Sequence, residues 1–212
     1  MKVENDKMPA GQHAPHGAGA TAPVALLAAN AEAIVRSCDT LDRAMRVGIE
    51  LPPAGARLLD GYHLLDTQLR LARAQARQGA VQDGAARVRD LAVDAVARAD
   101  GVVDTEELAR LLAVSQESAP LRVAELDALP ALLRLALIDR LATLAARAAH
   151  ACAGRERAAA WAARFLDTAE ARPGDLVLLF ADMARSADAD NGAFTAELAR
   201  RLQGRGAPLA QV

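Results

Sequence analysis

Residues 125–147 read ELDALPALLRLALIDRLATLAAR, a stretch in which leucine recurs every three or four residues over about six helical turns. This spacing predicts the longest apolar helix of the protein. Its leucine stripe consists of Leu126, Leu129, Leu133, Leu137, Leu141 and Leu144. Further apolar residues widen the stripe, so that only Arg134, Asp139 and Arg140 form a polar edge in water. We therefore expect other helices to cover this helix on most sides.

Two interruptions indicate where this helical region divides. Pro130 fits the first position of a helix, where its missing N–H costs nothing, and it disfavours helical geometry at Leu129. We therefore predict a short lead-in helix that breaks at this point. Ala153 and Gly154 predict a second break, followed by a separate helix over residues 155–171.

The remaining sequence also favours helix nearly everywhere. Alanine and leucine dominate the 212 residues, of which 52% are apolar, whereas aromatic residues make up only 2% and β-branched runs are scarce. Further helices are expected over residues 23–45, 54–78, 87–98, 108–115, 175–185 and 193–203. The prediction is an all-α fold, either a multi-helix bundle or a short α-solenoid of about seven to eight helices.

The helices are expected to form one domain between two tails. Residues 1–22 are rich in Gly, Pro, His and Ala and show no periodic apolar face, so we expect this tail to be disordered. Residues 23–204 form the single α-helical domain, and residues 205–212 form a C-terminal tail.

Local signals predict three details of the domain. Asp104 is followed three residues later by Glu107, which resembles a capping box that starts the helix containing residues 108–115. Gly61 falls inside a predicted helix, where glycine costs about 1 kcal/mol relative to alanine, and this favours the close approach of another helix. Trp161 and Phe165 have i,i+4 spacing and are expected to pack against each other.

Charge and composition exclude several classes of partner. The 25 basic and 27 acidic residues nearly balance, so there is no electrostatic footprint for nucleic acid or for an anionic membrane. No apolar stretch approaches the roughly 20 residues that a membrane span needs, and the amino terminus lacks the pattern of a secretory signal. We expect no direct membrane insertion and a cytoplasmic location. Cys38 and Cys152 are too few for a disulfide framework and are expected to be small buried hydrophobes.

One cluster has the residue types of acid–base chemistry. Asp60, Tyr62 and His63 lie close together in the sequence, with Asp66 nearby, and histidine beside a carboxylate can transfer protons near neutral pH. The alternative is structural, with the tyrosine and the histidine hydrogen-bonded at a helix contact.

Two short motifs resemble metal sites without completing one. His13 and His16 have H-x-x-H spacing but no further ligands. Asp188 and Asp190 match the D-x-D motif with which glycosyltransferases hold a metal and a sugar nucleotide, but no predicted strand precedes them, so a helix N-cap at Asp190 or Asn191 is the alternative. Residues 99–107 lack the oxygen-bearing spacing of a calcium loop. The sequence thus predicts no metal, no cofactor and no assigned catalytic residue.

Three stretches carry a resemblance to a known family. They read LPPAGARLLDGYHLLDTQL at residues 51–69, RVRDLAVDAVARADGVVDTEELARLL at 87–112 and LRVAELDALPALLRLALIDRLATLA at 121–145. In this order they resemble the amino-terminal helical region of cyclic β-1,2-glucan synthases, very large bacterial inner-membrane glycosyltransferases, and the resemblance covers roughly residues 24–206. The chain departs from the family at Arg57, Arg89 and Asp127, where tryptophan or tyrosine is usual, and at Gly61, where asparagine is common.

The resemblance implies a role without catalysis. The family polymerises glucose from UDP-glucose through a membrane-embedded transferase domain, and further domains cyclise and trim the glucan, but none of these domains is encoded here. The Gln-x-x-Arg-Trp motif of processive transferases is absent, since Trp161, the only tryptophan, follows three alanines. No catalytic or sugar-nucleotide residue of the family can be assigned to this chain.

Three hypotheses follow. The first is a non-catalytic helical scaffold that belongs to, or acts beside, a cyclic β-1,2-glucan synthase, with the synthase's membrane domains or a second copy of the chain as partner, and held at the cytoplasmic face of the inner membrane through that partner. The second is a free-standing helical adaptor for protein–protein interaction. The third is an enzyme that uses Asp60, Tyr62 and His63.

Overall fold

The computed structural model describes residues 21–77, 86–98, 101–186 and 191–203. Within these ranges the chain forms eight α-helices and one short 3-10 helix, with no strand, so the predicted all-α fold of about eight helices is confirmed. The first helix begins at Thr21, slightly before the expected start of the domain. Residues 1–20 and 204–212, which contain most of the two predicted tails, lie outside the described residues.

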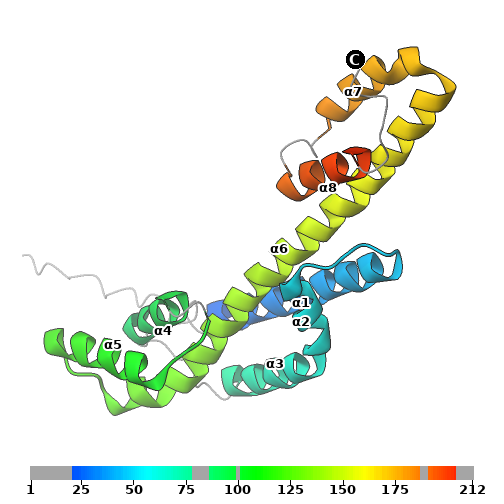
Figure 1. Cartoon of the computed structure of the whole chain (residues 1–212). Helices are drawn as coiled ribbons and strands as arrows, with labels where there is room; N and C mark the ends of the chain where they lie inside the picture. The colour runs from blue at the N-terminus through cyan, green and yellow to red at the C-terminus, as the bar shows by residue number, and fades with distance from the viewer. Residues whose placement is uncertain (1–20, 78–85, 99–100, 187–190, 204–212) are drawn as a thin grey trace, which may run out of the picture.

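One long helix organises the molecule. The elements are α1 (Thr21–Arg46), α2 (Pro53–Asp60), α3 (Tyr62–Arg77), α4 (Ala86–Arg98), α5 (Thr105–Ser118), α6 (Val123–Ala171), η1 (Pro173–Asp175), α7 (Leu176–Ala184) and α8 (Gly192–Gln203). Figure 1 shows α6 as a rod through the whole molecule, with α4 and α5 near its start, α1 to α3 beside its first half and middle, and α7 and α8 at its far end. The result is an elongated molecule built along one axis.

The predicted break at Pro130 is wrong, because α6 begins earlier and continues through the proline. The main-chain N–H of Arg122 donates to Oε2 of Glu125 at 2.8 Å, which fixes the helix start ahead of Val123. Pro130 is therefore the eighth residue of a 49-residue helix and has no N–H for its i−4 carbonyl. Burial of Leu129 and Leu132 on the adjoining face offsets this cost.

The predicted break at Gly154 is also wrong, and the glycine has a different role. It lies buried inside α6, where a Cβ atom at its position would be only 2.6 Å from Nδ2 of Asn191, the residue just before α8. The glycine therefore makes room for the start of α8 against α6. A close approach between helices occurs here rather than at Gly61.

Gly61 instead divides the predicted helix over residues 54–78 into α2 and α3. Its backbone has φ −89° and ψ 6°, and its N–H donates to the carbonyl of Arg57 at 3.0 Å. A Cβ atom at this position would meet only the Arg57 carbonyl oxygen, at 3.2 Å, and no atom of another helix. The expectation of a close helix contact at Gly61 is thus wrong, and the residue forms a corner between two helices.

The face of α6 that other helices cover is lined mainly by alanine. In its first half and middle the buried residues are Ala128, Leu129, Ala131, Leu132, Ala136, Ile138, Ala142, Ala145, Ala148, Ala149 and Cys152. Of the predicted leucine stripe only Leu129 is buried, and Leu126 is 41% exposed. Small side chains allow α1 to pack closely on this face, so the leucines are turned to the less covered side. Of the expected polar edge, Asp139 is exposed and accepts a hydrogen bond from Nδ2 of Asn30 at 2.9 Å, whereas Arg134 and Arg140 are half-buried.

Three separate hydrophobic clusters lie along α6. The largest joins α1, α2 and α3 to its middle and includes Ile34, Leu41 and Cys152. A second joins α4 to the first turns, around Val88 and Leu132. The third joins α7 and α8 to the far end and consists of Ala158, Ala162, Phe165, Leu176, Leu179, Phe194 and Leu198. Because each cluster contains residues from a different segment of α6, this helix connects the three clusters.

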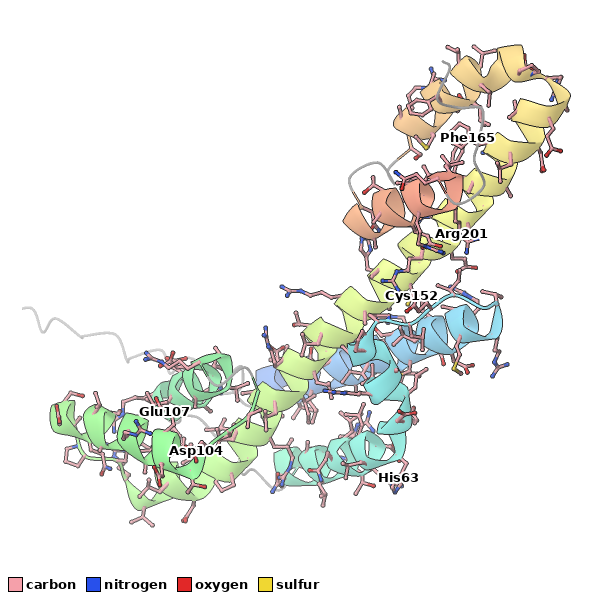
Figure 2. All side chains as sticks on the ribbon, in the orientation of Figure 1. His63, Asp104, Glu107, Cys152, Phe165 and Arg201 are labelled. Atoms are coloured by element: carbon pink, nitrogen blue, oxygen red, sulfur yellow. The ribbon has the colours of Figure 1, made fainter. Side chains whose placement is uncertain are left out.

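Two other local predictions can be compared with the structure. Asp104 caps α5, accepting from the N–H of Glu106 at 3.3 Å, while Glu107 pairs with Arg110 at 3.3 Å. Figure 2 labels Asp104 and Glu107. The N-cap is thus confirmed. Glu107 pairs with Arg110 in the next turn of α5 rather than completing a capping box with Asp104. The rings of Trp161 and Phe165 lie 6.1 Å apart, which confirms the packing pair.

Candidate functional site

An open hollow lies between the α2–α3 corner and the first half of α6. We call it the leucine groove. It has a volume of about 620 Å³ and is lined chiefly by Leu58, Leu64, Leu65, Leu133, Leu137 and Leu141. Leu64 is 60% exposed. The leucines that the sequence predicted to be covered on α6 thus form one wall of an open apolar surface, and the Gly61 corner shapes the other wall.

The charged side chains that line the leucine groove are both cationic. They belong to Arg57 and Arg134. The Nε of Arg134 donates to Oε1 of Gln68 at 3.2 Å, and its Nη1 donates to Oε1 of Gln75, so the guanidinium bridges α6 and α3 at the edge of the groove. An apolar floor with a fixed polar edge suits the binding of an amphipathic helix rather than proton transfer.

The predicted cluster of Asp60, Tyr62 and His63 lies at the α2–α3 corner, next to the groove but not in its lining. Asp60 ends α2 and Tyr62 begins α3, and all three residues are exposed, Tyr62 by 40%. Figure 2 shows His63 on the outer side of this corner. Neither the tyrosine nor the histidine is buried at a helix contact, so the structural alternative is wrong. Asp66 pairs instead with Arg70 at 3.0 Å.

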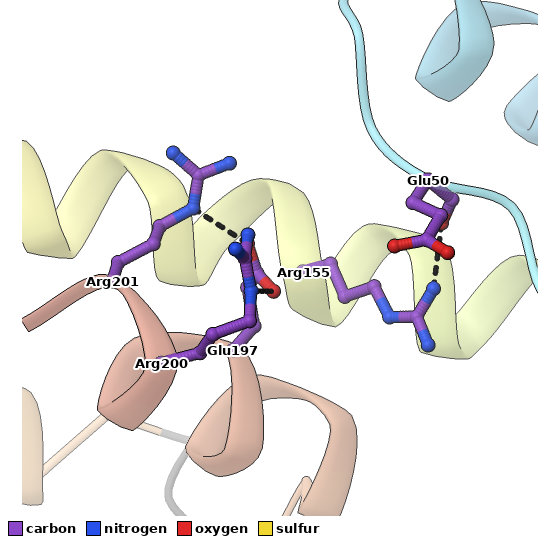
Figure 3. Close-up of polar contacts among 5 residues, drawn as sticks. All are labelled: Glu50, Arg155, Glu197, Arg200 and Arg201. Carbon is purple, nitrogen blue, oxygen red and sulfur yellow. Dashed lines mark hydrogen bonds and ion pairs between the residues drawn. The ribbon is translucent and has the colours of Figure 1, made fainter. Parts of the chain in front are cut away.

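A polar cluster that the sequence analysis missed lies where α8 faces α6 and the α1–α2 loop (Figure 3). Glu197 accepts from Nε and Nη2 of Arg200 at 2.8 and 2.6 Å, and from Nε of Arg201 at 2.6 Å. The hydrogen bond from Arg200, helped by Arg201, outweighs burial and lowers the pKa of Glu197 to about 2. The carboxylate therefore stays charged at every ordinary pH.

This cluster borders a cleft of about 400 Å³ between α8 and the α1–α2 loop. Across the cleft, Nη1 of Arg155 donates to the main-chain carbonyl of Glu50 at 2.6 Å and ties α6 to that loop. The i,i+3 and i,i+4 spacing of Glu197 with the two arginines could have been found in the sequence. The Arg155–Glu50 contact could not, because the two residues are 105 positions apart.

Asn191 has the capping role that the sequence offered as the alternative to a D-x-D metal site. Its Oδ1 accepts from the N–H groups of Ala193 and Phe194 at 3.0 and 3.3 Å, which confirms the N-cap of α8. Its Nδ2 lies 3.0 Å from Nε2 of His150 on α6. Asp188 and Asp190 lie outside the described residues, as do His13 and His16.

The described residues hold no group of three or more His, Cys, Asp or Glu side chains that could bind a metal ion. Cys38 and Cys152 are both buried, as expected, and burial is the main cause of the raised pKa of each thiol. None of the helices in the described part of the chain combines the length and the hydropathy that crossing a membrane requires. Comparisons with protein-family models, with curated proteins and with solved structures found no match.

Proposed function

We propose that the protein is a non-catalytic helical scaffold that belongs to, or acts beside, a cyclic β-1,2-glucan synthase. The observation that carries this proposal is the spatial arrangement of the three stretches that resemble that family. Residues 51–69 form the α2–α3 corner, residues 87–112 supply α4 and the start of α5, and residues 121–145 form the first half of α6. All three are joined by the first two hydrophobic clusters, so these three stretches lie together in one continuous half of the molecule.

The shape of the molecule supports a scaffold role. One helix of 49 residues connects three clusters. Different helices pack on it in each cluster, so different helices face the solvent along its length. The candidate acid–base residues are exposed at a corner and do not line the leucine groove. Glucosyl transfer from UDP-glucose is assigned to synthase domains outside this chain, so the chain alone is expected to be inactive. Its proposed place is the cytoplasmic face of the inner membrane, through that partner.

The proposal is tested in a bacterium that makes cyclic β-1,2-glucan. Affinity-tagged chain should co-purify with the membrane transferase, and deletion of the coding region for residues 24–206 should lower the amount of cyclic glucan. Full-length chain supplied in trans should restore it. The proposal is wrong if neither co-purification nor glucan output changes. Recovery of other proteins without the transferase would favour the adaptor hypothesis instead.

A further inference from the structure

Two of the uncovered apolar surfaces of the described molecule lie far apart along α6. One is the leucine groove. The other is the outer face of α7, where Val177, Leu178 and Phe180 are 63%, 68% and 59% exposed. Val177 and Leu178 form the centre of this face, and Phe180, whose ring also packs on Phe165, forms its edge. The opposite face of α7 is anchored to the third cluster through Leu176 and Leu179.

The two surfaces cannot cover each other within one molecule. The groove is built around Leu137 of α6, whereas α7 packs near Phe165, where the Phe165 and Phe180 rings lie 5.8 Å apart. Those two positions of α6 are 28 residues apart, or roughly 42 Å at the helical rise of 1.5 Å per residue. Figure 1 shows α7 at the far end of the rod from α3. Only a second molecule can bring them together.

The groove and α7 match in length and in shape. The part of α6 between Leu133 and Leu141 is about 12 Å long, and the nine residues of α7 span about 13 Å. The groove is concave and apolar, and α7 presents a convex apolar face. A short helix laid into an apolar groove is a common mode of protein recognition.

Their charges also match. The charged residues lining the groove are Arg57 and Arg134, whereas the one charged residue within α7 is Asp182. Asp182 follows Leu178 by one helical turn and therefore lies at the edge of the exposed apolar face. Its ion pair with Arg185, at 2.6 Å, joins two exposed side chains, 58% and 75% exposed, so little free energy opposes its exchange for an arginine of the groove.

We propose that the leucine groove of one molecule binds α7 of a second copy of the chain. Val177 and Leu178 enter the groove, the exposed side of the Phe180 ring lies at its edge, and Asp182 faces its arginines. The contact joins two different surfaces, so each molecule has one groove and one α7 to offer, and association is head-to-tail. This self-association goes beyond the proposed scaffold function and does not depend on the identity of the synthase.

The test measures the mass of the full chain by sedimentation velocity over a range of concentrations. The wild type should associate, and Leu64→Glu in the groove or Leu178→Glu in α7 should each weaken association by about tenfold or more, because each buries a carboxylate in an apolar contact. Val114→Glu is the matched control, since Val114 is 65% exposed on α5, away from both surfaces, and it should associate like the wild type. If circular dichroism shows that a glutamate variant loses helix, Leu64→Gln or Leu178→Gln replaces it in the same measurement.

Mixing the two variants provides the decisive measurement. Leu64→Glu retains an intact α7 and Leu178→Glu retains an intact groove, so the mixture should form a one-to-one complex that neither variant forms alone. The proposal is overturned if the wild type is monomeric at every concentration, if both variants associate like the wild type, or if the mixture stays monomeric.

Discussion

Asn191 occupies the space that a side chain at position 154 would need, because a Cβ atom on Gly154 would lie 2.6 Å from its Nδ2 and 2.9 Å from its Oδ1. The same asparagine caps α8 and is itself buried. The start of α8 is therefore fixed to the middle of α6 by one glycine and one asparagine.

Gly154→Ala should lower the free energy of unfolding. Alanine favours helix by about 1 kcal/mol over glycine, but displacing Asn191 strains the packing by about 1–3 kcal/mol and disturbs a cap that contributes about 1 kcal/mol. Urea unfolding of Gly154→Ala, Asn191→Ala and the double variant gives the coupling between the two positions. The substitution should be less harmful when Asn191 is already alanine. A stabilising Gly154→Ala in the wild-type background would contradict the close contact.

Ala145→Leu should destabilise the protein by about 1–3 kcal/mol or more, because Ala145 is 2% exposed on the face of α6 that meets α1 and a larger side chain overpacks it. Ala146→Leu is the matched control, since the neighbouring alanine is exposed and tolerates the larger side chain. Thermal unfolding of both variants measures the difference. Equal effects at the two positions would mean that the alanine face is not the packed one.

Pro130→Ala should stabilise the protein by about 1–2 kcal/mol. The alanine restores an N–H that can donate to the carbonyl of Leu126 and removes the steric conflict of a ring inside a helix, while part of this gain is lost to a more flexible unfolded chain. Pro120→Ala, before the start of α6, is the control and should bring no such gain. Chemical denaturation compares the two. Destabilisation by Pro130→Ala would indicate that α6 does break at this residue.

Glu197→Gln should remove a contribution to the free energy of unfolding that the wild type loses in acid. The pKa of Glu197 is about 2 in the folded protein, below its ordinary value of 4.5, so its contribution to stability is present above about pH 4.5 and is lost as the pH falls towards 2. The contribution is about 1–3 kcal/mol after allowance for the exposed arginine partner. The glutamine variant should lose less stability over that interval than the wild type. Glu32→Gln is the matched control for the loss of an exposed ion pair, here with Arg36, and should change the stability by less than about 1 kcal/mol. Identical profiles for Glu197→Gln and the wild type would refute the assignment.

The helical class and most helices follow from apolar spacing and composition, because these depend on neighbours along the chain. The misplaced breaks share one cause. Proline and glycine indicate where a helix can end, but at Pro130 and Gly154 the packing of α4 and α8 decides that it continues. At Gly61 the reverse occurs: a continuous helix was predicted, but α2 ends at this glycine.

Which face of α6 is buried could not be read from hydrophobicity alone. Leucine is more apolar than alanine, yet helices approach most closely over small side chains, so the alanines are covered and the leucines form the groove. The groove depends on the distant corner at Gly61, and the contact of Arg155 with Glu50 joins residues far apart in sequence. No local pattern encodes either feature.

The claim that one continuous α6 forms the axis of the molecule is tested most directly by a distance measurement between spin labels at Asp127 and Ala163. Both residues are exposed, and they lie 36 residues or about ten turns apart, so both labels leave the same face of the helix. An unbroken α6 predicts a single narrow distribution centred at roughly 54 Å. A distribution centred well below that distance, or one with two separate peaks, would contradict it.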